Sequence, residues 1–351
     1  MLRYTRREFL RRLGSAGLGT LAGSWLLSAC GSSDTATQEV ALPPAATATP
    51  SGVLISPAAT VMPSAAPVNP TAGPTVSGAI EYPHVVVTRG AEPEELVRRA
   101  IAALGGMERF VRPGANVIVK PNICVAYHSY EYAATTNPWV VGALVKLCLE
   151  AGARQVRVMD QPFGGGAEEA YVRSGIQEQV HAAGGQMELM ANFKFVPTDI
   201  PQGKDLRNWD IYDDVLKADV LIDVPVAKHH SLARLTLGMK NLMGVIRNRP
   251  AMHRNLGQRL ADLASRIRPT LTVVDAVRIL TANGPSGGNL DDVKQADTII
   301  ASTDIVAADS YAATLFGLQP GDLDFVRAGT AMGLGRSDLG NLKIEELVVG
   351  A

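Results

Sequence analysis

Short runs of apolar, β-branched residues alternate along this chain with amphipathic segments, and this alternation restricts the fold more than any other feature. The runs lack the polar alternation of a half-exposed strand, as expected of parallel strands covered on both faces. Strands are predicted at residues 84–88, 116–120, 155–159, 219–224, 270–274 and 298–301. Helices are predicted at residues 94–104, 138–151, 257–267 and 305–316. The sequence therefore predicts an α/β fold with three layers, a mostly parallel, doubly wound sheet with helices on both faces.

The N-terminal residues carry two export features in the expected order. The stretch Thr5-Arg6-Arg7-Glu8-Phe9-Leu10-Arg11 resembles a twin-arginine signal, and the apolar stretch after it is too short to span a bilayer as a mature helix. Leu27-Ser28-Ala29-Cys30 resembles a bacterial lipoprotein cleavage site. We expect residues 1–29 to be a signal peptide handled by the twin-arginine translocase, and Cys30 to be the lipidated residue. The mature chain is then anchored to the extracytoplasmic face of a bacterial membrane.

Residues 30–80 are predicted to be a disordered tether. The segment is rich in Pro, Ala and Thr and contains no Lys or Arg. Such a composition cannot bury enough apolar surface to offset chain entropy, and its prolines favour extended conformations. The remaining residues, 81–351, are enough for one α/β domain.

Polar residues follow four of the predicted strands. Lys120 ends the strand at 116–120 and Asn122 comes just after it, Asp160 follows the next strand, and Lys228 follows the strand at 219–224. Asp275 follows the strand at 270–274, and Asn283 lies in the loop beyond it. In open α/β sheets ligands bind beyond the carboxyl ends of the strands. These residues therefore predict a binding site at one edge of the sheet.

A basic segment without any Asp or Glu extends over residues 224–261, although the whole chain has a formal net charge of −1. At its centre, Lys228, His230 and Lys240 predict an anion clamp, with Asn241 beside it. The alternative is a solvated surface patch, but Lys228 directly follows a buried strand and Lys240 lies in a glycine-flanked turn, which favours the clamp. Four further arginines are predicted to be surface charges or charges that face lipid headgroups: Arg247, Arg249, Arg254 and Arg259. Export and the lack of interleaved aromatic residues argue against nucleic acid as a partner.

Candidate metal ligands and cysteines are few. His230, His253 and Asp160 are candidate ligands of a divalent metal, although no HExxH or similar spacing is present, and structural hydrogen bonds are the alternative. With Cys30 lipidated, Cys124 and Cys148 remain, too few to ligate an iron–sulfur cluster by this chain alone. The two cysteines can pair in an oxidising compartment or stay as buried free thiols, and the second interpretation is favoured.

These motifs resemble those of the family called domain of unknown function 362. The matching residues are Lys120-Pro121-Asn122, Thr135-Thr136-Asn137-Pro138, Asp160, Lys228, His230, Thr236, Lys240-Asn241-Leu242-Met243-Gly244, His253, Asp262, Asp275, Asn283-Gly284-Pro285, Asp304, Ala307 and Asp309. The resemblance covers about Val85 to Gly317. The family's reaction is unassigned, so the resemblance implies a domain and no activity. Some members carry ferredoxin-like Cys clusters that this chain lacks, and His229 and Arg234 depart from the usual pattern, which has a small or uncharged residue there.

Two classes of function are consistent with these features. The first is an enzyme that acts on a small anionic substrate, either with or without a metal. In this hypothesis Lys228 and Lys240 hold the substrate or act as electrophiles, and His230 or Asp160 is the general acid or base. The predicted substrate-binding residues are Lys120, Asn122, Asn241, Asp275 and Asn283. The second class is a non-catalytic lipoprotein that binds an anionic ligand or cofactor.

Overall fold

The computed structural model describes residues 81–350. The predicted signal peptide (residues 1–29), the tether (residues 30–80) and the lipidation site Cys30 lie outside the described residues. The strands of the main sheet are β1 (Val85–Arg89), β2 (Asn116–Pro121), β3 (Gln155–Val158), β4 (Gln186–Met187), β7 (Val220–Val224), β8 (Val226–His230), β9 (Arg234–Thr236), β10 (Leu271–Leu280), β11 (Val293–Ser302) and β12 (Ile344–Val348). A separate antiparallel pair consists of β5 (Phe195–Asp199) and β6 (Asn208–Tyr212).

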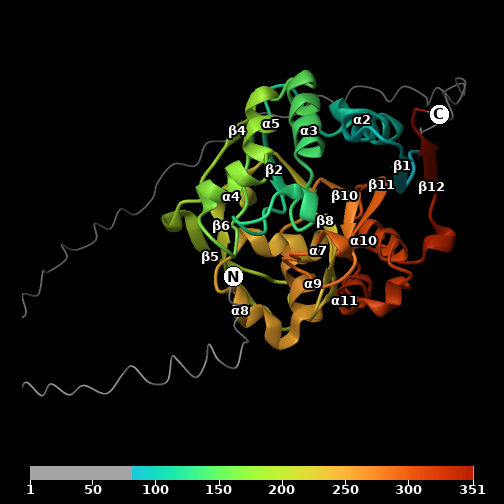
Figure 1. Ribbon diagram of the computed structural model, residues 1–351. Helices are drawn as coiled ribbons and strands as arrows, with labels where there is room; N and C mark the ends of the chain where they lie inside the picture. The colour runs from blue at the N-terminus through green and yellow to red at the C-terminus, as the bar shows by residue number, and fades with distance from the viewer. Residues whose placement is uncertain (1–80, 351) are drawn as a thin grey trace, which may run out of the picture. The chain divides into compact units, whose positions relative to one another are not determined.

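The helices lie between and around these strands (Figure 1). The α-helices are α2 (Pro93–Ala103), α3 (Pro138–Glu150), α4 (Ala167–Arg173), α5 (Ile176–Ala182), α6 (Asp213–Lys217), α7 (Gly238–Asn241), α8 (Arg249–Met252), α9 (Leu256–Arg266), α10 (Ile305–Thr314) and α11 (Asp324–Ala331). Short 3₁₀ turns are η1 (Met107–Arg109), η2 (Tyr130–Tyr132), η3 (Asn192–Lys194), η4 (Leu242–Val245), η5 (His253–Asn255), η6 (Leu290–Asp292), η7 (Pro320–Asp322) and η8 (Leu339–Asn341). Among residues 81–350, no helix is long and apolar enough to cross a membrane.

The sheet is mostly parallel, as predicted. Its strands follow the order β12-β1-β11-β10-β7-β2-β3-β4, and β8 and β9 attach at β10. The neighbours β10, β7, β2, β3 and β4 are all parallel. The expectation that the strand at 298–301 is parallel was wrong, because β11 is antiparallel to both β10 and β1. The cause is the length of β10, which continues to Leu280, after which the chain reverses through residues 281–292 into β11.

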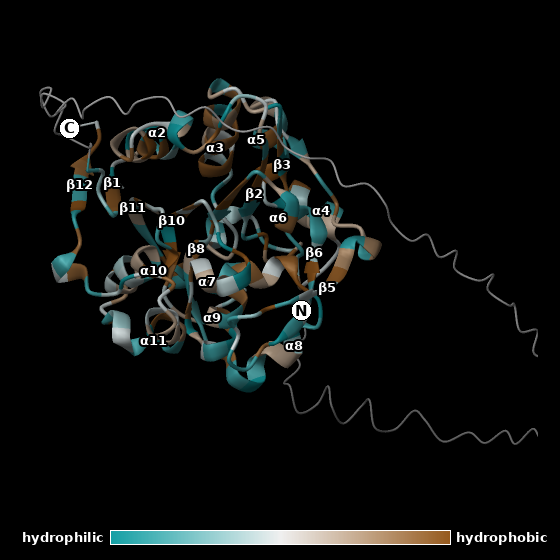
Figure 2. Ribbon diagram, turned by 180° about the vertical axis from the view of Figure 1, so that it is seen from behind, coloured by the Kyte–Doolittle hydropathy of each residue, from teal (hydrophilic) through white to brown (hydrophobic). Residues whose placement is uncertain are grey.

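Apolar side chains on the two faces of the sheet form two separate cores, which gives the three predicted layers. In β1, Val86 packs on one side of the sheet while Val85 and Val87 pack on the other. Helices α2, α3 and α5 cover the first face, and α9, α10 and α11 cover the second (Figures 1 and 2). The α/β fold with helices on both faces is therefore confirmed.

Two helix starts follow the capping rules. Helix α3 begins after Asn137, whose side-chain oxygen accepts a hydrogen bond from the Trp139 amide at 3.0 Å, and Pro138 occupies the first helical position. Helix α10 begins after Asp304, whose carboxylate accepts from the Ala307 amide at 2.9 Å. Both side chains are therefore N-caps.

The basic segment folds as a hairpin and two short helices, which the sequence did not predict. After Pro225 the chain continues as β8, pairs with β10 and turns back as β9, so that Lys228 lies opposite Thr236. Arg234 takes the left-handed conformation at the turn, with φ of 64°. Because β10 is longer than predicted, it provides the pairing edge for β8. This arrangement carries the basic residues beyond the carboxyl ends of β2, β3 and β7.

Candidate functional site

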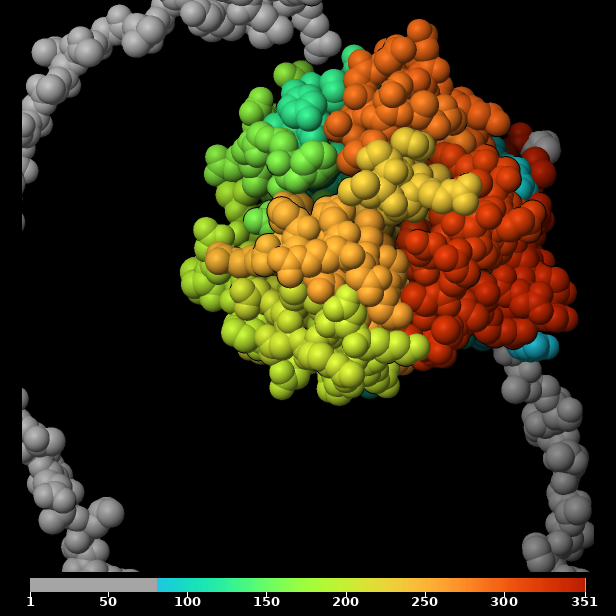
Figure 3. All heavy atoms as spheres, turned by 90° about the horizontal axis from the view of Figure 1, so that it is seen from below, coloured from blue at the N-terminus to red at the C-terminus, as the bar shows by residue number. Residues whose placement is uncertain are grey.

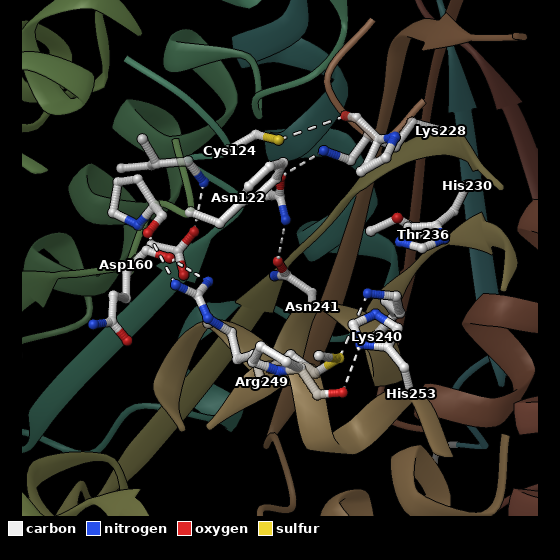
Figure 4. A pocket seen from close by; sticks show the side chains of 18 residues that line it. Asn122, Cys124, Asp160, Lys228, His230, Thr236, Lys240, Asn241, Arg249 and His253 are labelled. Carbon is white, nitrogen blue, oxygen red and sulfur yellow. Dashed lines mark hydrogen bonds between the residues drawn. The ribbon is translucent and has the colours of Figure 1, made fainter. Parts of the chain in front are cut away.

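A cavity of about 530 Å³ lies beyond the carboxyl ends of β2, β3 and β7 (Figure 4). Its walls come from the chain after β2, the loop after β3, the β8–β9 hairpin, and α7 with the segment leading to α8. In Figure 3 the orange segment around residue 250 lies between the green segment around residue 160 and the yellow hairpin around residue 230. The lining residues are Asn122, Ile123, Cys124, Asp160, Gln161, Pro162, Phe163, Lys228, His230, Thr236, Lys240, Asn241, Met243, Gly244, Arg249, Pro250, His253 and Pro285.

Asp160, the carboxylate of this cavity wall, is already neutralised by a lysine. Lys120 Nζ lies 2.8 Å from Asp160 Oδ1, and both side chains are almost completely buried. Asp160 Oδ2 accepts from the Ile123 amide at 2.6 Å, while Lys120 donates to Pro121 O and Asn241 Oδ1, each at 2.8 Å. The approach of Lys120 to Oδ1 lacks the angle of a hydrogen bond, so the contact is an ion pair without a directional bond. Lys120 therefore lies behind the cavity wall as the counter-charge of Asp160.

Gly244 is required by this ion pair. A Cβ atom at position 244 would lie 1.8 Å from Asp160 Oδ1 and 2.6 Å from Lys120 Nζ. Both groups are buried and held by other bonds, so neither can move aside. Gly244, the glycine of the Lys-Asn-Leu-x-Gly sequence, therefore leaves the space that the Lys120–Asp160 ion pair occupies.

Lys228 extends from β8 to the cavity and has no carboxylate partner among residues 81–350. Its ammonium donates to Asn122 Oδ1 at 2.9 Å and to Ala134 O at 2.6 Å, and the residue is 1% exposed. Burial lowers the pKa of Lys228 because water no longer stabilises the charge. Asn122 in turn donates to Asn241 Oδ1 at 2.9 Å, so the two asparagines link Lys228 to Lys120.

Lys240 is the least satisfied cation of the site. It lies on α7. Among residues 81–350, its ammonium has one contact within hydrogen-bond range, the Met243 sulfur at 3.5 Å. Burial, and then repulsion by Lys228, lower its pKa to about 8.

The buried carboxylate of Asp309 fixes the start of α7, since it accepts from the amides of Gly238 at 2.6 Å and Met239 at 3.0 Å. Burial raises the pKa of Asp309 to about 7, against the effect of these two amides.

Arg249 is a cation of the site that the sequence analysis assigned to the surface. Its guanidinium donates to Gln161 O at 2.7 Å and to Pro162 O at 2.9 Å, and burial lowers its pKa. Its partners are backbone carbonyls, so the side chain brings an uncompensated positive charge to the wall. No local sequence signal distinguishes Arg249 from its basic neighbours. Arg259, by contrast, pairs with Asp205 at 2.9 Å.

The ring of His230 is a neutral hydrogen-bond donor. Its Nδ1 accepts from the amides of Leu232 at 3.1 Å and Ala233 at 3.2 Å, so the proton of the neutral ring is on Nε2. Burial, and then the charges of Lys240 and Lys228, lower its pKa to about 3. The predicted role as a general base is not compatible with this arrangement, because neither nitrogen has a free lone pair.

The predicted metal ligands do not form a metal-binding group. His230 lacks a free lone pair, both Asp160 oxygens are engaged, and His253 is exposed with its ring centre 6.5 Å from that of His230. Within residues 81–350 no group of three or more His, Cys, Asp or Glu side chains is arranged to hold a metal. The donor set therefore does not fit a divalent cation.

Thr236 contributes a buried polar atom with no partner. Its hydroxyl oxygen is inaccessible to solvent, the residue is 3% exposed, and no hydrogen-bond partner lies near it among the described residues. Thr236 is one of the lining residues, and Figure 4 places its oxygen beside the ring of His230. Buried hydroxyls are normally hydrogen-bonded, so this atom indicates that something else completes the site. Thr236 belongs to one of the matched motifs, but no role could be predicted for it from the sequence.

Asp275 and Asn283 lie outside the cavity, contrary to the expectation that they join the site. Asp275 accepts from the amides of Asn137 at 2.7 Å and Val277 at 3.0 Å, and burial raises its pKa to about 6. Asn283 donates to Asp292 at 2.8 Å on the surface. The reason is again the length of β10, which continues past Asp275 and carries the following loop away from the edge.

The cysteines are both free and buried, as the favoured interpretation predicted. Cys148 lies on the buried face of α3, where burial raises the pKa of its thiol to about 12. Cys124 lines the cavity and donates to Pro285 O at 3.5 Å. The two thiols therefore differ in their access to the site.

Because only Cys124 lines the cavity, the two free thiols allow a chemical test of the charge in the cavity. An anionic reagent is concentrated where uncompensated cations gather. We compare the rate of alkylation by iodoacetate with the rate of alkylation by neutral iodoacetamide. The ratio of these two rates should be several-fold higher for Cys124 than for a small thiol in the same buffer. Cys148 should stay unmodified. Peptide mapping assigns the modified residue. The preference should fall in Lys240→Met; an unchanged ratio in that variant would mean that the cavity carries no net positive potential.

Comparison with known proteins agrees with the matched motifs. The model of the family described as "Domain of unknown function (DUF362)" matches residues 117–314. The chain belongs to the DUF362 family. A curated relative, the thylakoid-associated protein sll1697 of Synechocystis sp. (strain ATCC 27184 / PCC 6803 / Kazusa), is 26% identical over 253 residues, which are 68% of this chain and 74% of that protein. All the cavity-lining residues lie within the span matched by the DUF362 model.

Solved structures show more distant similarity. The lactate racemase apoprotein of Thermoanaerobacterium thermosaccharolyticum aligns with a TM-score of 0.39 at 12% identity, covering 63% of this chain and 54% of that one. A structural-genomics protein of Thermotoga maritima aligns with a TM-score of 0.35 at 12% identity, covering 65% and 60%. In both cases this chain spans less than two thirds of the other protein.

Proposed function

We propose that the chain is an enzyme that binds a small anionic substrate in the cavity and acts on it. The observation that carries the proposal is the charge balance of the walls. Lys228, Lys240 and Arg249 face a space in which the carboxylate of Asp160 is already paired with Lys120. A desolvated cation normally has an anionic partner, and these three have none among residues 81–350. A carboxylate or phosphate group of a ligand would supply that partner.

The neutral donors of the site support the same proposal. The Nε2–H of His230 and the hydroxyl of Thr236 lie beside the cations and can donate to the oxygens of an anion. A cavity of about 530 Å³ is in the size range of small-molecule sites. The bound molecule would therefore be held by charge and by neutral hydrogen bonds together.

Lys240 is the group that we expect to take part in a reaction. A pKa of about 8 leaves a fraction of the side chain unprotonated near neutral pH, so it can exchange a proton with a substrate. This property favours an enzyme over the alternative of a non-catalytic ligand-binding lipoprotein. His230, which has no free lone pair, would position the substrate instead.

Titration of the full-length protein with sulfate tests whether the cavity is an anion site. Sulfate keeps its charge over the working pH range, and calorimetry at pH 7 measures its affinity. We expect one site per chain whose affinity falls less than tenfold when NaCl is raised from 0.05 to 0.3 M, because a desolvated site is weakly screened. Several weak sites that vanish at the higher salt concentration would identify a surface patch and contradict the proposal.

The proposed location is the extracytoplasmic face of a membrane, with lipid-modified Cys30 as the anchor. The relative sll1697 is described as thylakoid-associated, and the N-terminal motifs of this chain indicate export. We expect Arg6→Lys with Arg7→Lys to leave the precursor in the cytoplasm, since the paired arginines are what the translocase recognises. Cell fractionation measures this, and Cys30→Ser should abolish lipid labelling. Normal export of the double-lysine variant would contradict the twin-arginine assignment.

A further inference from the structure

The environment of Lys240 differs from that of the other lysines near the cavity. Lys120 is paired with Asp160, and the ammonium of Lys228 donates to Asn122 and Ala134. The ammonium of Lys240 contacts a thioether, which is a weak acceptor. Of these three amines, Lys240 is therefore the one that loses least when it gives up its proton. The position of Lys240 on α7 is fixed, because the buried Asp309 carboxylate accepts hydrogen bonds from the first amides of this helix.

We propose that Lys240 is a nucleophile that forms an imine with the carbonyl carbon of its substrate, and that the substrate is a small carboxylate bearing an aldehyde or ketone, such as a 2-oxo acid. This inference rests on the proposed anion site. The carboxylate of such a molecule would pair with Lys228 and Arg249, the two remaining cations of the wall. Its carbonyl carbon would then be presented to Lys240, with the Thr236 hydroxyl and the His230 Nε2–H available to the carbonyl oxygen.

The chemical step is balanced without any further reagent. The ammonium of Lys240 first releases a proton to solvent, and the lone pair on Nζ attacks the carbonyl carbon. The carbon–oxygen π electrons move to oxygen, and the proton that the attacking nitrogen gives up is transferred to this oxygen, which yields a neutral carbinolamine. The carbon–oxygen bond then breaks, a second proton makes the leaving group water, and nitrogen forms a double bond to carbon. The product is a protonated imine that keeps the positive charge at position 240.

The charges around Lys240 favour this chemistry. Burial, and then the charges of Lys228, Arg249 and Lys120, disfavour an ammonium there and lower the pKa of Lys240 to about 8. The other titratable groups that line the cavity are Cys124, Asp160, His230 and His253. A lysine that is desolvated beside another cation is a known route to an activated amine.

Reductive trapping of the full-length protein with pyruvate and sodium cyanoborohydride tests the proposal. We expect intact-mass analysis to show one adduct per chain and peptide mapping to place it on Lys240. Trapping should be faster at pH 8 than at pH 6, as the unprotonated fraction rises. Acetone, which has the ketone but no carboxylate, should be trapped at least tenfold more slowly at the same concentration.

Two variants separate the imine from general labelling. Lys240→Arg keeps the positive charge and cannot form an imine, so it should lose the adduct at position 240. Lys217→Arg, at an exposed lysine paired with Asp213, should behave like the unmodified protein. An adduct spread over surface lysines, or one that persists in Lys240→Arg, would overturn the imine. Sulfate binding without any trapping would also overturn it while leaving the anion site intact, whereas loss of sulfate binding would be a failure of the proposed function itself.

Discussion

Replacing Lys120 by methionine should lower the free energy of unfolding by about 3–5 kcal/mol, the cost of breaking a buried ion pair by removing one partner. The substitution leaves the Asp160 carboxylate buried without its counter-charge, and it removes the donor to Pro121 O and Asn241 Oδ1. Denaturant unfolding of the full-length protein followed by circular dichroism measures the change.

A surface lysine provides the matched control. Lys217 pairs with Asp213 at 2.5 Å but is 72% exposed, so Lys217→Met should cost less than about 1 kcal/mol. Adding Asp160→Asn to Lys120→Met should recover part of the loss, because the uncompensated charge is then removed. If Lys120→Met is as stable as Lys217→Met, the Lys120–Asp160 pair does not hold this edge of the sheet together.

Replacing Lys228 by methionine should weaken sulfate binding about ten- to a hundredfold, corresponding to the loss of one charge-assisted partner worth about 1.5–3 kcal/mol. Lys228 is 1% exposed and faces the cavity, so no water can substitute for its ammonium at the anion. Calorimetric titration at pH 7 measures the ratio of affinities. Thermal stability should change little, because a buried cation without an anionic partner contributes little to the folded state.

The same titration can be applied to a variant of an exposed arginine, as a control, and to the unaltered protein at several pH values. Arg254, an exposed residue of the same basic segment, should tolerate Arg254→Ala with less than a threefold change. In the unaltered protein, affinity should be fully present below pH 7 and fall as pH rises through about 8, where Lys240 loses its proton. Equal losses in Lys228→Met and Arg254→Ala, or an affinity independent of pH between 6 and 9, would contradict the cavity as the anion site.

The layers of the fold could be predicted because each buried strand is marked by its own residues. The runs ending at Lys120 and Val224 are apolar on both faces, and β2 and β7 are adjacent parallel strands in the sheet. The β8–β9 hairpin could not be predicted in the same way. Its strands contain Lys228 and His230, and their burial depends on the extension of β10, which is a tertiary effect that no local pattern records.

The site was partly predictable for a similar reason. Lys120 and Asp160 follow adjacent parallel strands, so their meeting follows from topology alone. Arg249 was placed on the surface by the sequence analysis because its burial depends on the carbonyls of Gln161 and Pro162, which are distant in the chain. The protonation of His230 depends on two backbone amides of the hairpin turn, which only the folded structure specifies.

The central claim is that the cations of the cavity bind a small anion. A crystal structure of the full-length protein soaked in selenate tests it most directly, since the anomalous signal of selenium locates each bound anion. We predict the strongest peak in the cavity, with selenate oxygens within hydrogen-bond distance of at least two of the side chains of Lys228, Lys240 and Arg249. Peaks confined to exposed residues such as Arg254, with the cavity left to water, would contradict the claim.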